Sequence, residues 1–457
     1  MDDDEKRKTK RSESAVPQSV VARAGSLAAA SLKGSLRLAM LGKKSHAKTA
    51  QDLVATLGRL KGASMKVGQL ASFIDAGVLP PETRELYQQT LASLRDAAPP
   101  MDPKLVRGVF IREFDAEPLE LFAAFDETPI AAASLGQVHL ATTHDGREVA
   151  VKVQYPGIES AIRSDLTLTS AMKPLLPLLA PGLDADDAMA EIKERVLEEC
   201  DYVFEAKNLD LLAKQYEGHP FVWIPSSIPE TSSRRILTME KATGIPFAKI
   251  KLLPQADKDR FGEMLFRFYY GSLHRYGFTS ADPHPGNYLL MEDGRLACFD
   301  FGLACRLPSH LRKEFHRAHI ALRDNDVEAL FEFGLAVRYV SGRQIDQQRF
   351  FDWVALSLDP IRLDREYTFT REFIAERTAA MMDMRNPWWN FIRRLSLPRW
   401  AMLLYRLELG LFAVLAQLEA TGNWHRMTME FYSDIDPTYS EPITELGREE
   451  KQWLATK

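Results

Sequence analysis

The chain is long enough for two folded lobes and an extension, and its composition excludes several classes of protein. It has 457 residues, of which 46% are hydrophobic and 26% are charged, as in an ordinary globular protein. A net charge of −5 gives no global signal for nucleic-acid binding. The three cysteines, Cys200, Cys298 and Cys305, have no paired spacing. They therefore predict neither a disulfide framework nor a zinc site, and they favour a reducing, cytosolic compartment.

The first 50 residues predict a tail followed by a helix. Residues 1–5 are acidic, unlike a secretory signal or a transit peptide, and residues 1–17 have the composition of a disordered segment. Residues 20–41 are rich in Ala, Leu and Ser with spaced basic residues, which is typical of a basic amphipathic helix. This helix could lie on an anionic membrane, and packing against the body of the protein is an equally good interpretation.

Residues 51–115 are predicted to be a helical extension, interrupted by Pro-Pro breaks at residues 80–81 and 99–100. Residues 116–242 alternate short strands with a long helical insertion, as expected of a small lobe with a β-sheet. The predicted elements of that lobe are an apolar stretch at 130–141, a hairpin turn at 144–147, a strand at 148–153, a helical stretch at 158–216 and strands at 221–224 and 235–240.

Residues 243–246 are predicted to be a linker, and the rest of the chain to 457 is predicted to be helical apart from one hairpin. The most apolar stretch, residues 401–418, contains Arg406 and Glu408 near its middle. Two charges there are costly in a bilayer, so a buried helix is the better prediction than a membrane span. The order of elements predicts an α+β, bilobal protein-kinase-like fold with a small mixed β-sheet N-lobe, a helical C-lobe and an N-terminal helical extension.

The hairpin carries the most informative residues of the chain. Asp282 precedes Asn287 by five positions, which is the spacing of the kinase catalytic loop, with the aspartate as catalytic base. Two short apolar strands joined by Asp293-Gly294 then lead to Asp300 of an Asp-Phe-Gly triplet. Asn287 at the entry and Asp300 at the exit of one hairpin can therefore share a magnesium ion, which takes its other ligands from phosphate and water.

Lys152 lies on a predicted strand in the sequence Val-Ala-Val-Lys, where a kinase has the lysine that binds the α- and β-phosphates. Such a lysine needs a carboxylate partner, and Glu205 on the following helix is the predicted partner. Each motif alone is weak, since a surface-strand lysine or a capped loop explains most single matches. Their order along the chain is what predicts a nucleotide site with Asp282, Lys152 and Glu205 as its catalytic residues.

An alanine-rich stretch precedes the lysine strand and is predicted to cover the phosphates. Alanines restrict the backbone where kinases have glycines, so this cover should be stiffer, with one permissive position left; tight strand packing is the alternative interpretation. Backbone groups of the linker should meet the adenine. The predicted nucleotide-binding residues are Ala131, Ala132, Ala133, Ser134, Gly136, Gln137, Val138, Lys152, Glu240 and Ala242.

With these motifs in place, the chain resembles the UbiB/AarF family of atypical kinase-like proteins from about residue 53 onward. Besides the alanine-rich loop and the catalytic elements, Lys66-Val-Gly-Gln69 resembles the family's K-x-G-Q motif and Glu199-Cys-Asp201 its E-x-D motif. The resemblance implies a helical extension folded over the nucleotide cleft. It places Lys66 and Gln69 near the phosphates, with Glu199 and Asp201 anchoring Lys66. Taken alone, the K-x-G-Q segment would be an exposed helix with a glycine.

Two features argue against an ordinary protein kinase. The Asp-Phe-Gly triplet is followed within ten residues by a helix, with no long activation segment, and Ser280 and Ala281 replace the usual His-Arg. The predicted function is therefore an ATPase or small-molecule kinase that uses ATP and Mg²⁺. The resemblance implies support of isoprenoid-quinone biosynthesis or lipid handling at a membrane surface. The alternatives are a nucleotide-gated switch for a lipid or partner, with little turnover, and a protein kinase acting in trans.

Overall fold

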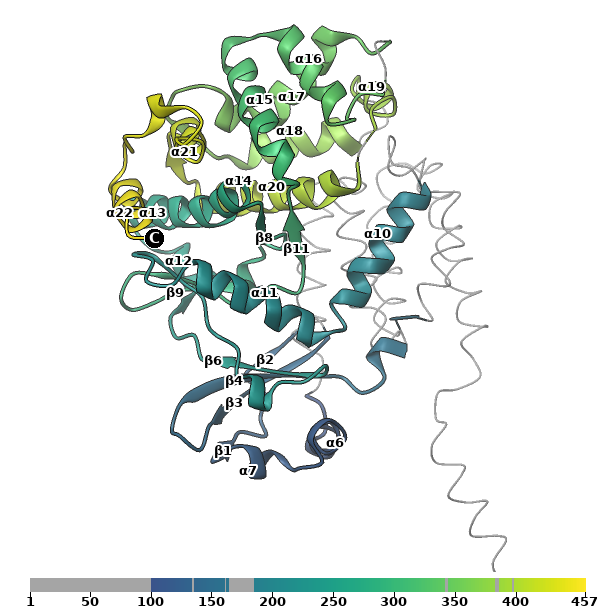
Figure 1. The fold of residues 1–457 in the computed structure, drawn as a ribbon, viewed down its shortest axis with the longest axis vertical. Helices are drawn as coiled ribbons and strands as arrows, with labels where there is room; N and C mark the ends of the chain where they lie inside the picture. Colours follow the sequence, from purple (N-terminus) through teal and green to yellow (C-terminus); the bar gives the residue numbers. More distant parts are fainter. Residues whose placement is uncertain are drawn as a thin grey trace, which may run out of the picture. The chain divides into compact units, whose positions relative to one another are not determined.

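The structure of the chain is a computed structural model that describes residues 100–133, 135–160, 162–163, 185–341, 344–382, 386–396 and 398–457. These residues belong to one folded unit, whose arrangement is drawn in Figure 1. The predicted N-terminal tail, its amphipathic helix and residues 51–99 of the predicted extension, which include Lys66 and Gln69, lie outside the described residues, as does Ser134. Residues 100–115 of the predicted extension are described.

The N-lobe contains an antiparallel sheet in the order β1-β3-β4-β6, with β2 paired to β3. The β3–β4 hairpin turns at the predicted position, where Gly146 takes a φ of +87° that favours glycine. Lys152 pairs with Val138 on one side and Leu237 on the other, so it sits in the centre of the sheet. The strands are β1 (Ala124–Phe125), β2 (Ala131–Ala132), β3 (Gly136–Thr142), β4 (Glu148–Gln154) and β6 (Ile236–Glu240).

Helices cover the two faces of this sheet. Helix α6 (Pro103–Phe114) packs through Val109 and Phe110 on the inward side chains of β4 and β6, and the short α7 (Pro118–Leu121) contacts β1. Helix α11 (Tyr202–Gln215) lies on the side that faces the C-lobe, after α10 (Ala185–Glu198) (Figure 1). Burial of α6 against the sheet makes it part of the N-lobe core.

A second sheet joins the lobes, in the order β5-β10-β9-β7. The predicted catalytic hairpin is present as β9 (Tyr288–Leu290) and β10 (Leu296–Cys298), and the predicted strand near residue 222 is β5 (Val222–Trp223). The predicted linker contains a short strand, β7 (Ile245–Pro246), paired with β9. Gly244 fits there because a Cβ would lie 2.4 Å from the carbonyl oxygen of Leu290.

The C-lobe is mainly helical, as predicted, but it also contains two small strand pairs that the sequence analysis missed. They are β8 (Phe278–Ser280) with β11 (Ala304–Arg306), and β12 (Tyr367–Thr368) with β13 (Thr421–Gly422). Strands of two or three residues leave no detectable alternation in the sequence. The helices are α12 (Phe247–Ile250), α13 (Gln255–Phe266), a π-helical turn (Arg267–Gly271), α14 (Ser272–Tyr276), α15 (Arg312–Asp324), α16 (Val327–Ala336), α17 (Gln347–Arg362), α18 (Arg371–Met382), α19 (Trp389–Ile392), α20 (Arg399–Leu418), α21 (Trp424–Glu430) and α22 (Glu445–Leu454).

Helix α20 is the apolar helix that the sequence placed in the interior. Within the described residues, Trp400–Leu418 is the one segment long and apolar enough to cross a membrane, and 61% of it is buried in the protein. Glu408 on this helix is buried and accepts hydrogen bonds from Arg377 at 3.1 Å and from Tyr270 at 3.3 Å. Partners inside the C-lobe therefore account for the charge at position 408.

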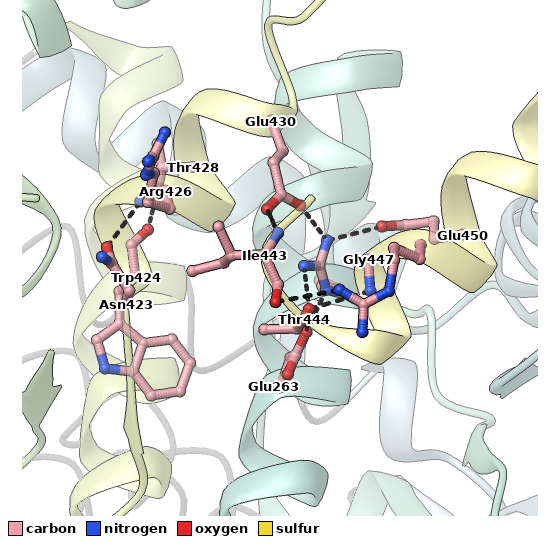
Figure 2. A network of polar contacts seen from close by, with 12 residues as sticks. Glu263, Asn423, Trp424, Arg426, Thr428, Glu430, Ile443, Thr444, Gly447 and Glu450 are labelled. Carbon is pink, nitrogen blue, oxygen red and sulfur yellow. Dashed lines mark hydrogen bonds and ion pairs between the residues drawn. The ribbon is translucent and has the colours of Figure 1, made fainter. Parts of the chain in front are cut away.

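A buried network of charges holds the C-terminal helix to the C-lobe. Glu263 of α13, Glu430 of α21 and Glu450 of α22 converge at one point, together with Thr444, the N-cap of α22 (Figure 2). The Arg267 guanidinium, fully buried, contacts the three carboxylates at 2.7, 2.8 and 3.0 Å. One arginine thus joins helices that are far apart in the sequence.

Candidate active site

Lys152 lies at the centre of the candidate active site, on β4. Its side chain is 8% exposed, and its Nζ lies 2.5 Å from Oε1 of Glu205 and 3.2 Å from Oδ2 of Asp300. Burial lowers the pKa of Lys152, but the negative charges of Asp300 and Glu205 outweigh burial and raise it above its usual value. The lysine is therefore a cation at neutral pH, in contact with the predicted partner and with one of the predicted metal ligands.

Helix α11 positions Glu205. The helix begins after Asp201, whose carboxylate accepts a hydrogen bond from the Val203 amide at 3.0 Å and so caps the helix. Glu205 follows one turn later, buried beneath the sheet. Asp201 therefore has a structural task as an N-cap, and its predicted contact with Lys66 lies outside the described residues.

The catalytic loop and the Asp300 loop are held together by the small strand pair β8–β11. Ser280, which replaces the usual histidine, donates a hydrogen bond from its Oγ to the Asp300 carbonyl oxygen at 3.2 Å and accepts one from the Asp282 amide at 3.3 Å. The Ala281 amide bonds to the Leu303 carbonyl oxygen at 2.8 Å. The serine thus links the two loops that carry the predicted catalytic and metal-binding carboxylates.

Asp282 makes two charge-assisted contacts. Arg406 of α20 donates to its Oδ1 at 2.8 Å, and the Asn287 amide nitrogen donates to its Oδ2 at 3.0 Å. Burial raises the pKa of Asp282, but Arg406, His284 and Asn287 outweigh it and hold the pKa below its usual range. The carboxylate is therefore ionised at neutral pH. Sequence reasoning missed Arg406 as a site residue, although a charge within an apolar helix was the available signal.

Asn287 and Asp300 have the chemistry of magnesium ligands. Asn287 uses its amide nitrogen on Asp282, which leaves the amide oxygen for a cation, and the Asp300 side chain is 34% exposed. Among the described residues no group of three or more His, Cys, Asp and Glu side chains could hold a metal by itself. Two hard oxygen donors fit an ion that keeps phosphate and water as its other ligands, as Mg²⁺ does.

The alanine-rich stretch forms an edge of the N-lobe sheet. Ala131 and Ala132 are exposed and pair with β3, and the Ala133 amide bonds to the Gly136 carbonyl oxygen at 2.9 Å. A Cβ on Gly136 would lie 2.0 Å from the Val153 carbonyl oxygen, so glycine is required for the close approach of β3 to β4.

Other predicted nucleotide-binding residues are placed as follows. The Gln137 side chain is buried in the N-lobe, where it bonds to His139 and accepts from the Met101 amide, and its backbone lies in the sheet between Ala132 and Val153. Glu240 ends β6, and its side chain accepts from the Ser226 amide at 2.8 Å. Ala242 follows in the linker, half-buried. The roles of these residues in nucleotide binding stay predictions.

The comparisons with known proteins agree with this arrangement. Residues 93–333 match the model of the ABC1 atypical kinase-like domain. The chain belongs to the ABC1 atypical kinase-like family, also called the UbiB family. This confirms the resemblance and the kinase-like fold that the sequence predicted. The yeast and rat relatives described below are named atypical kinases, and neither name states a substrate.

Several relatives cover much of this ABC1 chain. Atypical kinase COQ8, mitochondrial, of Saccharomyces cerevisiae is 27% identical over 459 residues, which is 94% of this chain and 88% of the yeast protein. Atypical kinase COQ8B, mitochondrial, of Rattus norvegicus is 28% identical over 64% of this chain and only 55% of the rat protein. The solved structure of the Rv3197–erythromycin complex from Mycobacterium tuberculosis is 31% identical, with a TM-score of 0.62 over 86% of this chain and 97% of that chain.

Proposed function

We propose that this protein binds Mg–ATP and transfers the terminal phosphoryl group to water or to a small molecule. The observation that carries this proposal is the contact of Lys152 with both Glu205 and Asp300. A buried ammonium held by one carboxylate and touching the metal-ligand carboxylate is the arrangement that protein kinases need before they can act. The family's name of kinase supports the same reaction class.

In the proposed mechanism Lys152 neutralises the α- and β-phosphates, while Glu205 keeps the lysine in place. Asn287 and Asp300 would hold magnesium, which would supply positive charge beside the transferred phosphoryl group. Asp282 orients the attacking hydroxyl and accepts its proton, a task that its ionised state permits. Gly136 and the exposed alanines of β2 cover the phosphates, and the backbone near Glu240 meets the adenine.

We further propose that the acceptor is a lipid-like or other small molecule at a membrane surface, in support of isoprenoid-quinone biosynthesis. After Gly302 the chain passes through β11 and a 3-10 turn directly into α15 at Arg312, which leaves little chain for a protein-substrate platform. The solved relative in complex with erythromycin supports a bulky small molecule as ligand. A protein kinase acting in trans is therefore the weakest alternative.

A second candidate function is a nucleotide-gated switch with little turnover. Arg406 supports it, because the guanidinium occupies one oxygen of Asp282, the carboxylate that should orient the acceptor. In that case nucleotide binding itself would change the protein's affinity for a lipid or a partner.

Magnesium-dependent ATP hydrolysis by the purified protein, with and without anionic liposomes, tests the proposal. Asp300→Asn should abolish turnover, whereas Asp293→Asn at the exposed tip of the same hairpin should leave it unchanged. Asp282→Asn separates the two candidates, since it should stop an enzyme but leave a switch able to bind nucleotide. Nucleotide binding without turnover under every condition would overturn the catalytic proposal and leave the switch.

A further inference from the structure

Helix α11 presents a second buried polar side chain beside Glu205, and nothing in the site described so far uses it. Asn208 lies three residues after Glu205, on the same face of the helix, and is 2% exposed. Its Nδ2 donates a hydrogen bond to the carbonyl oxygen of Phe301 at 3.1 Å. The Glu205 carboxylate lies beside the same loop, with its Oε2 3.6 Å from the position that a Cβ on Gly302 would take.

Helix α11 therefore reaches this loop through two side chains. The amide of Asn208 donates to the Phe301 carbonyl, and the Glu205 carboxylate lies against the adjoining Gly302. Phe301 directly follows Asp300, and its own side chain is buried. The position of the metal-ligand carboxylate thus depends on the position of α11.

The amide of Asn208 is itself held in one orientation. Its Oδ1 accepts a hydrogen bond from Nη2 of Arg306 at 3.3 Å, and the Arg306 guanidinium lies over the Phe278 ring at 4.3 Å. With the oxygen facing a cation, the nitrogen must face the Phe301 carbonyl. An apolar side chain of similar size at position 208 would leave that buried carbonyl without a donor.

The other side of Asp300 is already fixed by hydrogen bonds within the C-lobe. Ser280 donates to its carbonyl oxygen at 3.2 Å, and the Gly302 amide donates to its Oδ1 at 3.3 Å. The contact of Asn208 with Phe301 comes from the N-lobe side. A displacement of α11 toward or away from the C-lobe would therefore pull on one side of Asp300 only.

We propose that Asn208 is a positioning residue for the magnesium ligand Asp300. Asn208 links the position of α11 to the metal site. The Lys152–Glu205 ion pair and the correct position of Asp300 therefore form together. This inference rests on the proposed function, because it assigns Asn208 to the same Mg–ATP site.

The test measures binding of a fluorescent ATP analogue as a function of Mg²⁺ concentration. In Asn208→Leu, the Mg²⁺ concentration at half-saturation should rise about tenfold, as expected when one buried hydrogen bond that orients a ligand is lost. Affinity for the analogue in excess chelator should stay unchanged. The matched control is Thr428→Val, which removes another buried hydrogen bond, from Thr428 Oγ1 to the Trp424 carbonyl oxygen at 2.8 Å. That control should not move the Mg²⁺ dependence.

A second readout needs no nucleotide. In the ligand-free protein, hydrogen exchange of the backbone amides in residues 299–305 should be faster in Asn208→Leu than in the wild type, and unchanged in Thr428→Val. If Asn208→Leu does not fold, the variant Arg306→Met on the protein surface tests the same inference. It frees the orientation of the Asn208 amide and should raise the half-saturating Mg²⁺ concentration about threefold.

The outcomes separate the two proposals. If the wild type does not bind the nucleotide in a Mg²⁺-dependent manner, the proposed function is overturned, and the exchange data still report on the contact between α11 and the Asp300 loop. If the wild type binds and the variants at positions 208 and 306 keep its Mg²⁺ dependence, Asn208 is only a structural residue and the inference is wrong.

Discussion

In the buried cluster around Arg267, the contacts of each residue predict how much its substitution should lower the free energy of unfolding. The cluster contains two cations, Arg267 and Arg275, and three carboxylates, Glu263, Glu430 and Glu450. Glu450 contacts both cations, at 3.0 and 2.5 Å, and they hold its pKa well below the usual range against the opposing effect of burial. Of the two cations, Glu430 contacts only Arg267, and burial raises the pKa of Glu430.

The magnitudes therefore differ among the three substitutions. Arg267→Met leaves buried carboxylates without their central cation and should cost about 4 kcal/mol of unfolding free energy, within the range for breaking a buried ion pair. Glu450→Gln removes the partner of two cations and should cost about 3 kcal/mol. Glu430→Gln removes a carboxylate that burial already disfavours, so we expect about 1 kcal/mol or less.

Thermal unfolding followed by circular dichroism measures these differences at pH 7. With about 2 °C of melting temperature per kcal/mol for a large domain, Arg267→Met should melt roughly 8 °C below the wild type, and Glu430→Gln within about 2 °C of it. Equal losses for Glu430→Gln and Glu450→Gln would refute the reasoning, because they would mean that position in the helix packing, and not the number of cationic partners, sets the cost.

Three further predictions concern other parts of the chain. Burial, with smaller contributions from other histidines, lowers the pKa of His319 from 6.5 to about 3, so the unfolded state takes up a proton first as the pH falls. Lowering the pH from 7.5 to 5 should therefore reduce the free energy of unfolding by about 2 kcal/mol through this residue. Urea unfolding at both pH values should show a smaller reduction in His319→Gln, and an equal reduction would contradict the prediction. Arg406→Ala should raise the pKa of Asp282 and move the acidic limb of the pH–rate profile of ATP hydrolysis upward by about one pH unit, and an unmoved limb would exclude the electrostatic role. Gly136→Ala should destabilise the protein by about 3 kcal/mol or more in urea unfolding, because the added Cβ would meet the Val153 carbonyl. Gly108→Ala should be stabilising, because a Cβ there has nothing within 4 Å and alanine favours the helix. Similar effects of the two substitutions would argue against the close approach of β3 to β4.

The parts of the site that lie close together in the sequence could be predicted from it. The hairpin between Asn287 and Asp300 is marked by two apolar runs and an Asp-Gly turn, and Gly294 indeed has a φ of +82°. Lys152 was identified because the strand and turn before it have the same kind of local signature. Glu205 was chosen among several acidic residues on one helix, and the structure places it 2.5 Å from the lysine.

The parts that depend on distant residues could not be predicted. Arg406 lies 124 residues from Asp282 on an apolar helix, where the sequence showed only a charge that argues against a membrane span. Asn208 is 93 residues from Phe301, and an asparagine inside a helix is usually a solvent-facing residue. Such contacts are set by the tertiary packing of distant segments, which no periodicity in a single sequence records.

The Arg267 cluster has a consequence for how the chain is made. Glu450 lies 183 residues after Arg267, so a ribosome adding 5 to 20 residues per second needs roughly 10 to 40 s to supply it. For most of that interval, until Glu430 is made, the arginine has only its neighbour Glu263 to pair with, and closing the lobe would bury a guanidinium with two of its three carboxylate partners missing. The C-lobe is therefore expected to stay open on the ribosome, and accessible to chaperones, until α22 has been synthesised.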